Sequence, residues 1–134
     1  MSDPTLEILA ATVAALKAET SLTAIISDRV YDRAPQTVVY PFVQVAELQL
    51  IADDAECVDG FEVYIDIHAW SRSYGSPEVR RICSAVHTAL SSNFLTLSSF
   101  VMVETRHDST RVLSDPDGET SHGIITFRAL VDRL

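Results

Sequence analysis

Apolar and polar residues alternate most regularly along residues 61–70. The positions on one side of this pattern are apolar: Phe61, Val63, Ile65, Ile67 and Ala69. The positions between them are polar or aromatic: Glu62, Tyr64, Asp66, His68 and Trp70. Because successive side chains of a β-strand point to opposite faces, this pattern predicts a strand with one face in the core and a polar, aromatic face turned outward.

Three more segments are predicted to be strands: residues 42–50, 100–112 and 123–134. The first follows Tyr40-Pro41, and proline is tolerated at the first residue of a strand or on an edge. Residues 51–60 are acidic and turn-forming, and residues 115–118 (DPDG) are a strong turn signal between the last two strands.

Helical spacing of apolar residues begins near the N-terminus. Asp3 supplies a side-chain acceptor at the N-cap and Pro4 suits the first helical position, so a helix is expected from there to about Glu19. A short turn of helix is expected over residues 22–26. The predicted buried face of the long helix consists of Leu6, Leu9, Ala10, Val13 and Leu16.

A second long helix is predicted to start at Pro77. Ser76 caps it, and Glu78 lies near the positive end of its dipole. Its predicted buried stripe consists of Val79, Ile82, Cys83, Val86 and Leu90.

These elements together predict the fold class. Residues 27–36 are expected to be an extended connector, because the residue before Pro35 is disfavoured in a helix. The element order is then α-(short α)-β-β-α-β-β. Strands joined by hairpins, with helices to pack on one face, indicate an α+β fold. We expect a largely antiparallel four-stranded sheet packed by two main helices, in a single domain over residues 1–134.

Composition and charge narrow the class of protein. Apolar residues make up 47% of the chain, which predicts a packed core. We expect no signal peptide, no membrane anchor and a cytoplasmic location, because no apolar stretch is long enough to span a bilayer. The net charge of −9 opposes binding of nucleic acid through a broad phosphate-contacting surface, although not a wall that DNA slides past. Cys57 and Cys83 lack CxxC spacing and are expected to be reduced.

Motifs for catalysis or cofactor binding are absent from the sequence. It contains neither a GxSxG elbow nor a glycine-rich phosphate loop. No two of the four histidines, which are His68, His87, His107 and His122, have the i, i+4 spacing of a zinc helix. Asp66 and His68 share a strand face, but such a pair is more often a solvated or interfacial polar face than a metal site. We therefore expect no metal, no cofactor and no enzymatic activity.

The outward face of the second strand carries residue types that are enriched at protein interfaces. Tyrosine, tryptophan and arginine dominate interface hot spots. For Trp70, packing under a helix at the sheet edge is an equally supported alternative. The residues predicted to form an oligomer or partner interface are Tyr64, Asp66, His68, Trp70, Arg72 and Tyr74.

Several short segments, spread over nearly the whole chain, occur in an order that is found in a known family. They are Arg29-Val30-Tyr31 with Pro35, Tyr40-Pro41-Phe42-Val43, Trp70-Ser71-Arg72 followed by Gly75 and Glu78, residues 115–118, His122-Gly123 and Phe127-Arg128. In this order the chain resembles the tail terminator or tail-completion proteins of long-tailed phages, prophages and gene transfer agents. The resemblance implies a hexameric ring at the head-proximal end of the tail, which stops tube polymerisation and docks to the head connector. It carries over no catalytic residues.

A ring of this kind defines the expected partners. It closes through head-to-tail contacts, so each subunit presents two different patches, and strand edges and loops are natural places for them. The partners are other copies of the chain, the major tail tube protein and the head–tail connector, with DNA only passing through an acidic lumen. No membrane is expected, and the location is the cytoplasm during assembly and then the tail. Residues hypothesised to reach the tube or the connector are Asp53, Asp54, Glu56, Asp59, Asp115 and Asp117.

Three other functions stay open on the sequence alone. The first is a connector stopper or adaptor, which would dock one position nearer the capsid. The second is a small metal-dependent hydrolase with a site around Asp66, His68 and His122. The third is a monomeric binding module or an antitoxin-like partner.

Overall fold

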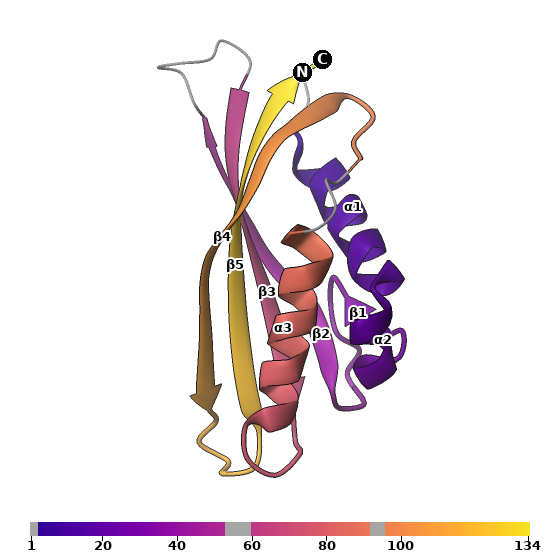
Figure 1. Ribbon diagram of the computed structural model, residues 1–134, viewed down its shortest axis with the longest axis vertical. Helices are drawn as coiled ribbons and strands as arrows, with labels where there is room; N and C mark the ends of the chain where they lie inside the picture. Colours follow the sequence, from indigo (N-terminus) through magenta and orange to yellow (C-terminus); the bar gives the residue numbers. More distant parts are fainter. Residues whose placement is uncertain (1–2, 53–59, 92–95) are drawn as a thin grey trace.

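Three helices and one mixed sheet make up the part of the chain that the computed structural model describes, residues 3–52, 60–91 and 96–134 (Figure 1). The elements are α1 (Thr5–Ala18), α2 (Thr20–Ile26), β1 (Val30–Tyr31), β2 (Phe42–Ala52), β3 (Gly60–Ser71), α3 (Pro77–Ser91), β4 (Phe100–Ser114) and β5 (Ser121–Arg133). The α+β class is confirmed, and every predicted helix and strand is present.

The sheet contains one more strand than predicted. Its order is β1-β2-β3-β5-β4, and all neighbours are antiparallel except β1 with β2, which run parallel. The prediction of four strands is wrong because β1 lies in the segment expected to be an extended connector. Two contacts hold this segment against β2: the carbonyl of Arg29 accepts from the Val43 amide at 3.0 Å, and the Arg29 Nε atom donates to the Pro41 carbonyl at 2.8 Å.

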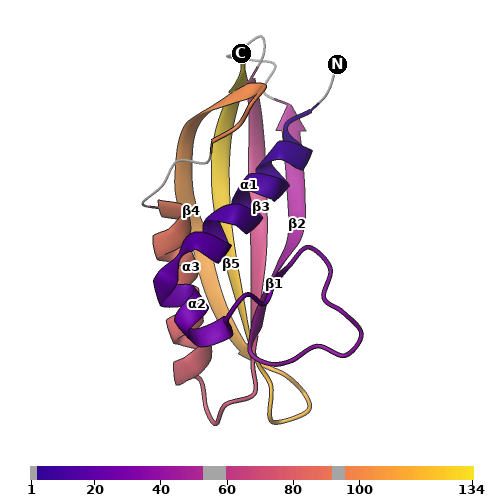
Figure 2. The same cartoon turned by 90° about the vertical axis from the view of Figure 1, so that its right-hand side faces the viewer.

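The helices cover only one face of the sheet, and none of the described elements covers the other (Figures 1 and 2). The hydrophobic core lies between the helices and the covered face. Along β3 and β5 the side chains on that face are fully buried, and they are Val63, Ile65, Ile67, Ala69, Ile125, Phe127, Ala129 and Val131. The alternation predicted for residues 61–70 is therefore confirmed.

Helix α3 packs on the sheet through its predicted stripe. The helix contacts β3, β4 and β5, and every predicted stripe residue is buried: Val79, Ile82, Cys83, Val86 and Leu90. The carbonyl of Ser76 accepts from the Arg80 amide at 3.0 Å, which places Ser76 at the N-cap as predicted. The helix comes so close to β5 at Gly123 that a Cβ atom there would lie 2.5 Å from the Cys83 sulfur.

Helix α1 forms where predicted but buries a different face. Its fully buried side chains are Ile8, Thr12 and Leu16. Leu6 is 75% exposed and Ala10 is exposed, so their predicted burial is wrong. The helix is apolar on most of its sides, and its residue pattern therefore does not single out one face. Its N-cap is Pro4 rather than Asp3, whose carboxylate accepts from the amide of Thr5 at 2.9 Å.

Candidate functional site

The uncovered face of the sheet carries the interface residues predicted on β3. Tyr64, Asp66, His68 and Trp70 alternate with the buried residues of β3 and are half-buried. The register places them beside β2 on one side and β5 on the other. Their predicted outward orientation is confirmed, and their role in an interface stays a prediction.

An aromatic cluster lies at one end of this face. The ring of Trp70 stacks on His122 with centroids 3.7 Å apart and an interplanar angle of 9°. Phe42 stacks on Trp70 from the other side at 6.2 Å, and Tyr40 meets Phe42 edge-on at 5.2 Å. Trp70 thus packs between β2 and β5 on the face away from the helices, so the alternative that it packs under a helix is wrong.

The cluster includes two histidines that contact each other, His68 and His122. The Nε2 atom of His122 and the Nδ1 atom of His68 are 2.8 Å apart, a distance at which one ring donates a hydrogen bond to the other. Burial lowers the pKa of His68, and burial together with the neighbouring His68 lowers the pKa of His122. Both effects favour neutral rings.

The carboxylate of Asp66 is oriented by the next strand. Its Oδ1 atom accepts from the Thr126 hydroxyl at 2.6 Å. Within the described residues, no group of three or more His, Cys, Asp or Glu side chains could hold a metal ion. Asp66, His68 and His122, the residues of the hydrolase hypothesis, therefore do not form a metal-binding group.

An ion pair joins β5 to β3 on the uncovered face. Arg128 of β5 donates through Nε to the carboxylate of Glu62 on β3. This hydrogen bond raises the pKa of Arg128. Tyr64 is directly opposite Arg128 in the register, so the polar row continues across the strands.

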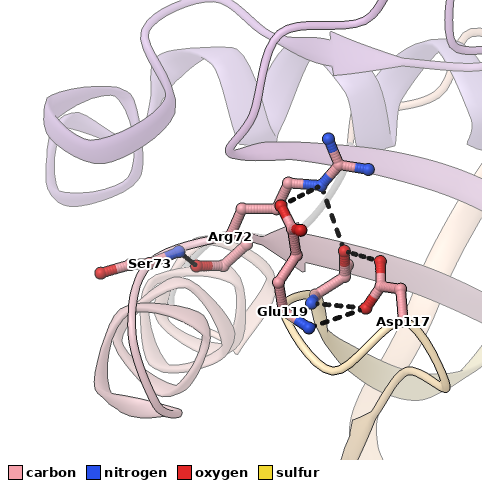
Figure 3. Close-up of polar contacts among 6 residues, drawn as sticks. Arg72, Ser73, Asp117 and Glu119 are labelled. Carbon is pink, nitrogen blue, oxygen red and sulfur yellow. Dashed lines mark hydrogen bonds and ion pairs between the residues drawn. The ribbon is translucent and has the colours of Figure 1, made fainter.

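Arg72 ties the end of β3 to the turn between β4 and β5 (Figure 3). Its Nε atom donates to the Thr120 hydroxyl at 3.1 Å and lies 3.8 Å from a carboxylate oxygen of Glu119. The Arg72 guanidinium also lies over the ring of Tyr40, 4.0 Å from its centroid. Arg72 therefore contacts two other segments of the chain, the β4–β5 turn and the connector before β2, and its side chain remains exposed.

Asp117 organises that turn from within (Figure 3). Its carboxylate accepts from the amides of Glu119 and Thr120 at 2.9 and 2.8 Å and from the Thr120 hydroxyl at 2.6 Å. These hydrogen bonds, that of the hydroxyl first, lower the pKa of Asp117. The Asp117 carboxylate is therefore already engaged within the turn, and its predicted contact with a partner stays a prediction. Asp115 contributes backbone groups, its amide donating to the Thr120 carbonyl at 2.8 Å.

Tyr74 is the most exposed of the predicted interface residues. Its side chain is 101% exposed in the connection between β3 and α3, next to Gly75, which has φ +73°. The acidic residues Asp53, Asp54, Glu56 and Asp59 lie outside the described residues.

Two partners of the predicted interface residues, Thr120 and Thr126, were not identified from the sequence. His122 and Thr126 on β5 and Thr120 in the turn contact them only because β3 and β5 are neighbours. The pairing of one strand with another cannot be predicted from the spacing of residues along a single strand. The same register does bring His122 and His68 together, two residues that the hydrolase hypothesis had grouped.

The helices are short compared with a membrane span. Within the described residues, no single helix is long and apolar enough to cross a bilayer. The pair α1 and α2 passes on combined length and composition, but it is bent by 80° between the two helices.

Comparison with known proteins places the chain in a family. A family model described as tail completion protein gp17 matches residues 10–132. The chain belongs to this family. Tail completion protein gp17 of Bacillus phage SPP1 is 28% identical over 93 residues, 69% of this chain and 69% of that protein. The resemblance seen in the sequence is confirmed, and the family is one of structural proteins of phage tails.

Two solved structures share the fold. A chain in the virion of a native gene transfer agent particle superposes with a TM-score of 0.88 at 21% identity, covering 98% of this chain and 99% of that chain. The structure of the SPP1 gp17 protein superposes with a TM-score of 0.64 at 24% identity, covering 93% and 88%.

Proposed function

We propose that this chain is a tail terminator. Copies of it close into a hexameric ring at the head-proximal end of a phage-type tail. The ring ends polymerisation of the tail tube and joins the tail to the head connector. The chain acts without catalysis or a cofactor, first in the cytoplasm and then in the finished tail.

Membership of the tail-completion family, by a match over residues 10–132, is the observation that carries this proposal. The fold supports it, because the superposed chain of the gene transfer agent particle is covered almost from end to end. A protein that works by assembly needs surfaces rather than a pocket. The uncovered sheet face and the exposed Tyr74 are surfaces of that kind.

The charge of the chain agrees with a ring through which DNA passes. A net charge of −9 gives a wall that repels phosphate, so a genome could move past without binding. The major tail tube protein and the head–tail connector are the partners on the two sides of the ring, and DNA is not bound.

Deletion of the gene in the strain that produces the particles tests the proposal, with electron microscopy as the readout. Loss of a terminator leaves overlong or unjoined tails, and re-expression of the chain restores normal particles. Particles of normal length and normal joining after deletion would contradict the proposal. Free tails of normal length with leaky heads would assign the chain to the connector instead.

A further inference from the structure

Two strands of the sheet have free edges. β4 is the outermost strand on one side. On the other side β1 pairs only with Val43 and Gln44, so the outer edge of β2 beyond Gln44 has no partner strand among the described residues. Free edges offer unpaired backbone groups to a neighbouring chain.

Most of the exposed large apolar side chains are distributed along these two edges. Among the exposed large hydrophobic residues of the described part of the chain, only Tyr74 and Leu134 lie away from these two edges. Exposed apolar side chains at a free edge are available to contact another chain. The residues on β4 are Val101, Val103 and Leu113, and those on α1, the connector before β2 and β2 itself are Leu6, Val39 and Ile51.

A groove lies between a helix and the strand at each edge, and the two grooves differ in charge. The groove beside β2, about 300 Å³, is lined by Leu6, Leu48 and the acidic Asp32, together with residues 45–47 of the β2 edge. No basic residue is among its described lining residues. The groove beside β4, about 270 Å³, is lined by Arg80, His87, Cys83 and Val112, with no acidic residue among those described. The grooves are therefore complementary in charge.

Exposed side chains of opposite charge lie on the open face at the two edges. Glu47 on β2 and Arg111 on β4 are both exposed, and neither side chain has a hydrogen-bond or ion-pair partner within the described residues. Arg106 differs, because it pairs with Glu104 at 2.7 Å.

The register shows that these two charges lie at nearly the same level of the sheet. Glu47 is opposite Asp66 on β3, which is opposite Thr126 on β5, which in turn is opposite Ser109 on β4. Arg111 is the next residue of β4 on the same face. β4 runs antiparallel to β2, so a second copy rotated about an axis along the strands would bring its Arg111 beside Glu47.

We propose that a second copy of this chain docks its β4 edge against the β2 edge of the first, head to tail. The inference rests on the ring of the proposed function and names its subunit contact. Bulges at Ala46, Val103 and Asp108 interrupt the free backbone rows of both edges. Side chains rather than a long hydrogen-bonded ladder therefore determine the contact, and open-ended growth of the sheet is disfavoured.

Charge reversal on the full-length purified chain tests this contact, with mass photometry and negative-stain microscopy as readouts. Glu47→Arg places two positive charges together and Arg111→Glu two negative ones. Each variant should raise the dissociation constant of self-association about tenfold or more. The control Arg81→Glu reverses an exposed charge on α3, away from both edge strands, and should assemble like the wild type.

Mixing the two variants gives the decisive result. A head-to-tail ring of alternating Glu47→Arg and Arg111→Glu copies has opposite charges at every contact, so an equimolar mixture should regain rings. Loss of rings in both variants without recovery on mixing would overturn the inference. A wild-type chain that stays monomeric at millimolar concentration would do the same.

Failure of this contact and failure of the proposed function are distinguishable. Rings that form equally well from both variants would refute the β4–β2 contact and leave the terminator proposal standing. The deletion phenotype described above tests that proposal without reference to any particular subunit contact.

Discussion

At the scale of single residues, Gly123 has the least room for a side chain. A Cβ atom there would lie 2.5 Å from the sulfur of Cys83 and 3.3 Å from the Cγ2 atom of Val79. Gly123→Ala should therefore lower the free energy of unfolding by about 1–3 kcal/mol through overpacking. Urea unfolding followed by circular dichroism measures this change.

The cause can be checked by removing the atom that is in the way. In a Cys83→Ala background, Gly123→Ala should cost clearly less than in the wild type, because the closest contact is gone. Gly118→Ala is the matched control: Gly118 has φ +76° with nothing near its Cβ position, so its cost should be the same in both backgrounds. An equal cost of Gly123→Ala in the two backgrounds would show that Cys83 is not the obstacle.

The histidine pair gives the stability of the protein a pH dependence. The pKa of His68 and that of His122 are both lowered from 6.5 in the folded chain, chiefly by burial. Below that value the unfolded chain binds more protons than the folded one. The stability is therefore complete above pH 6.5 and decreases as the pH falls through it towards the lowered values.

Removing one ring of the pair should weaken this dependence. We expect His122→Gln to show a smaller loss of unfolding free energy than the wild type when urea titrations at about pH 8 and about pH 5.5 are compared. His87→Gln, a histidine outside the pair, should retain the wild-type loss. An unchanged loss in His122→Gln would mean that the pair does not titrate as described.

At the scale of elements, the turn between β4 and β5 depends on one carboxylate. Asp117→Asn removes the charge that accepts from the amides of Glu119 and Thr120. The hydrogen exchange of those two amides should accelerate, because an amide oxygen accepts more weakly than a carboxylate. Asp115→Asn is the control in the same turn, since the bonds of Asp115 run through its backbone. Equal acceleration in both variants would argue against the role of Asp117.

The pattern of residues predicted the elements that have a strong local signal. β3 alternates along its whole length, and α3 has a capping serine, a proline at its first position and a polar side opposite its stripe. β1 was missed because it has only two paired residues, and those depend on long-range contacts such as Arg29 with Pro41. The face of α1 was mistaken because alanine and leucine occur on nearly all of its sides.

The sequence predicted which side chains of the candidate site face outward, but not which residues they contact. Alternation alone placed Trp70 and His68 on the outward face. That Trp70 stacks on His122, and that Arg72 reaches Thr120, follows from the pairing of β3 with β5, which brings residues about fifty positions apart into contact. The spacing of residues within one strand holds no information about that pairing.

At the scale of the whole molecule, a substitution at Tyr74 should affect assembly without affecting stability. Its fully exposed side chain contributes little to the core, so Tyr74→Ala should change the free energy of unfolding by less than about 0.5 kcal/mol. Because Tyr74 is a predicted interface residue, the Tyr74→Ala substitution should nevertheless reduce the yield of joined particles when the variant replaces the wild type in the producing strain. Ser73→Ala, the neighbouring exposed position, should leave the yield unchanged. Wild-type yields from Tyr74→Ala would remove Tyr74 from the interface.

The central claim is that this chain forms the ring between tail and head. Cryo-electron microscopy of intact particles at the head–tail junction tests it most directly, because this fold can be fitted into resolved density. The account predicts one closed ring of this chain at the head-proximal end of the tail tube, with six copies and with the β4 edge of each copy against the β2 edge of the next. A junction whose density contains no copy of this fold would contradict the account.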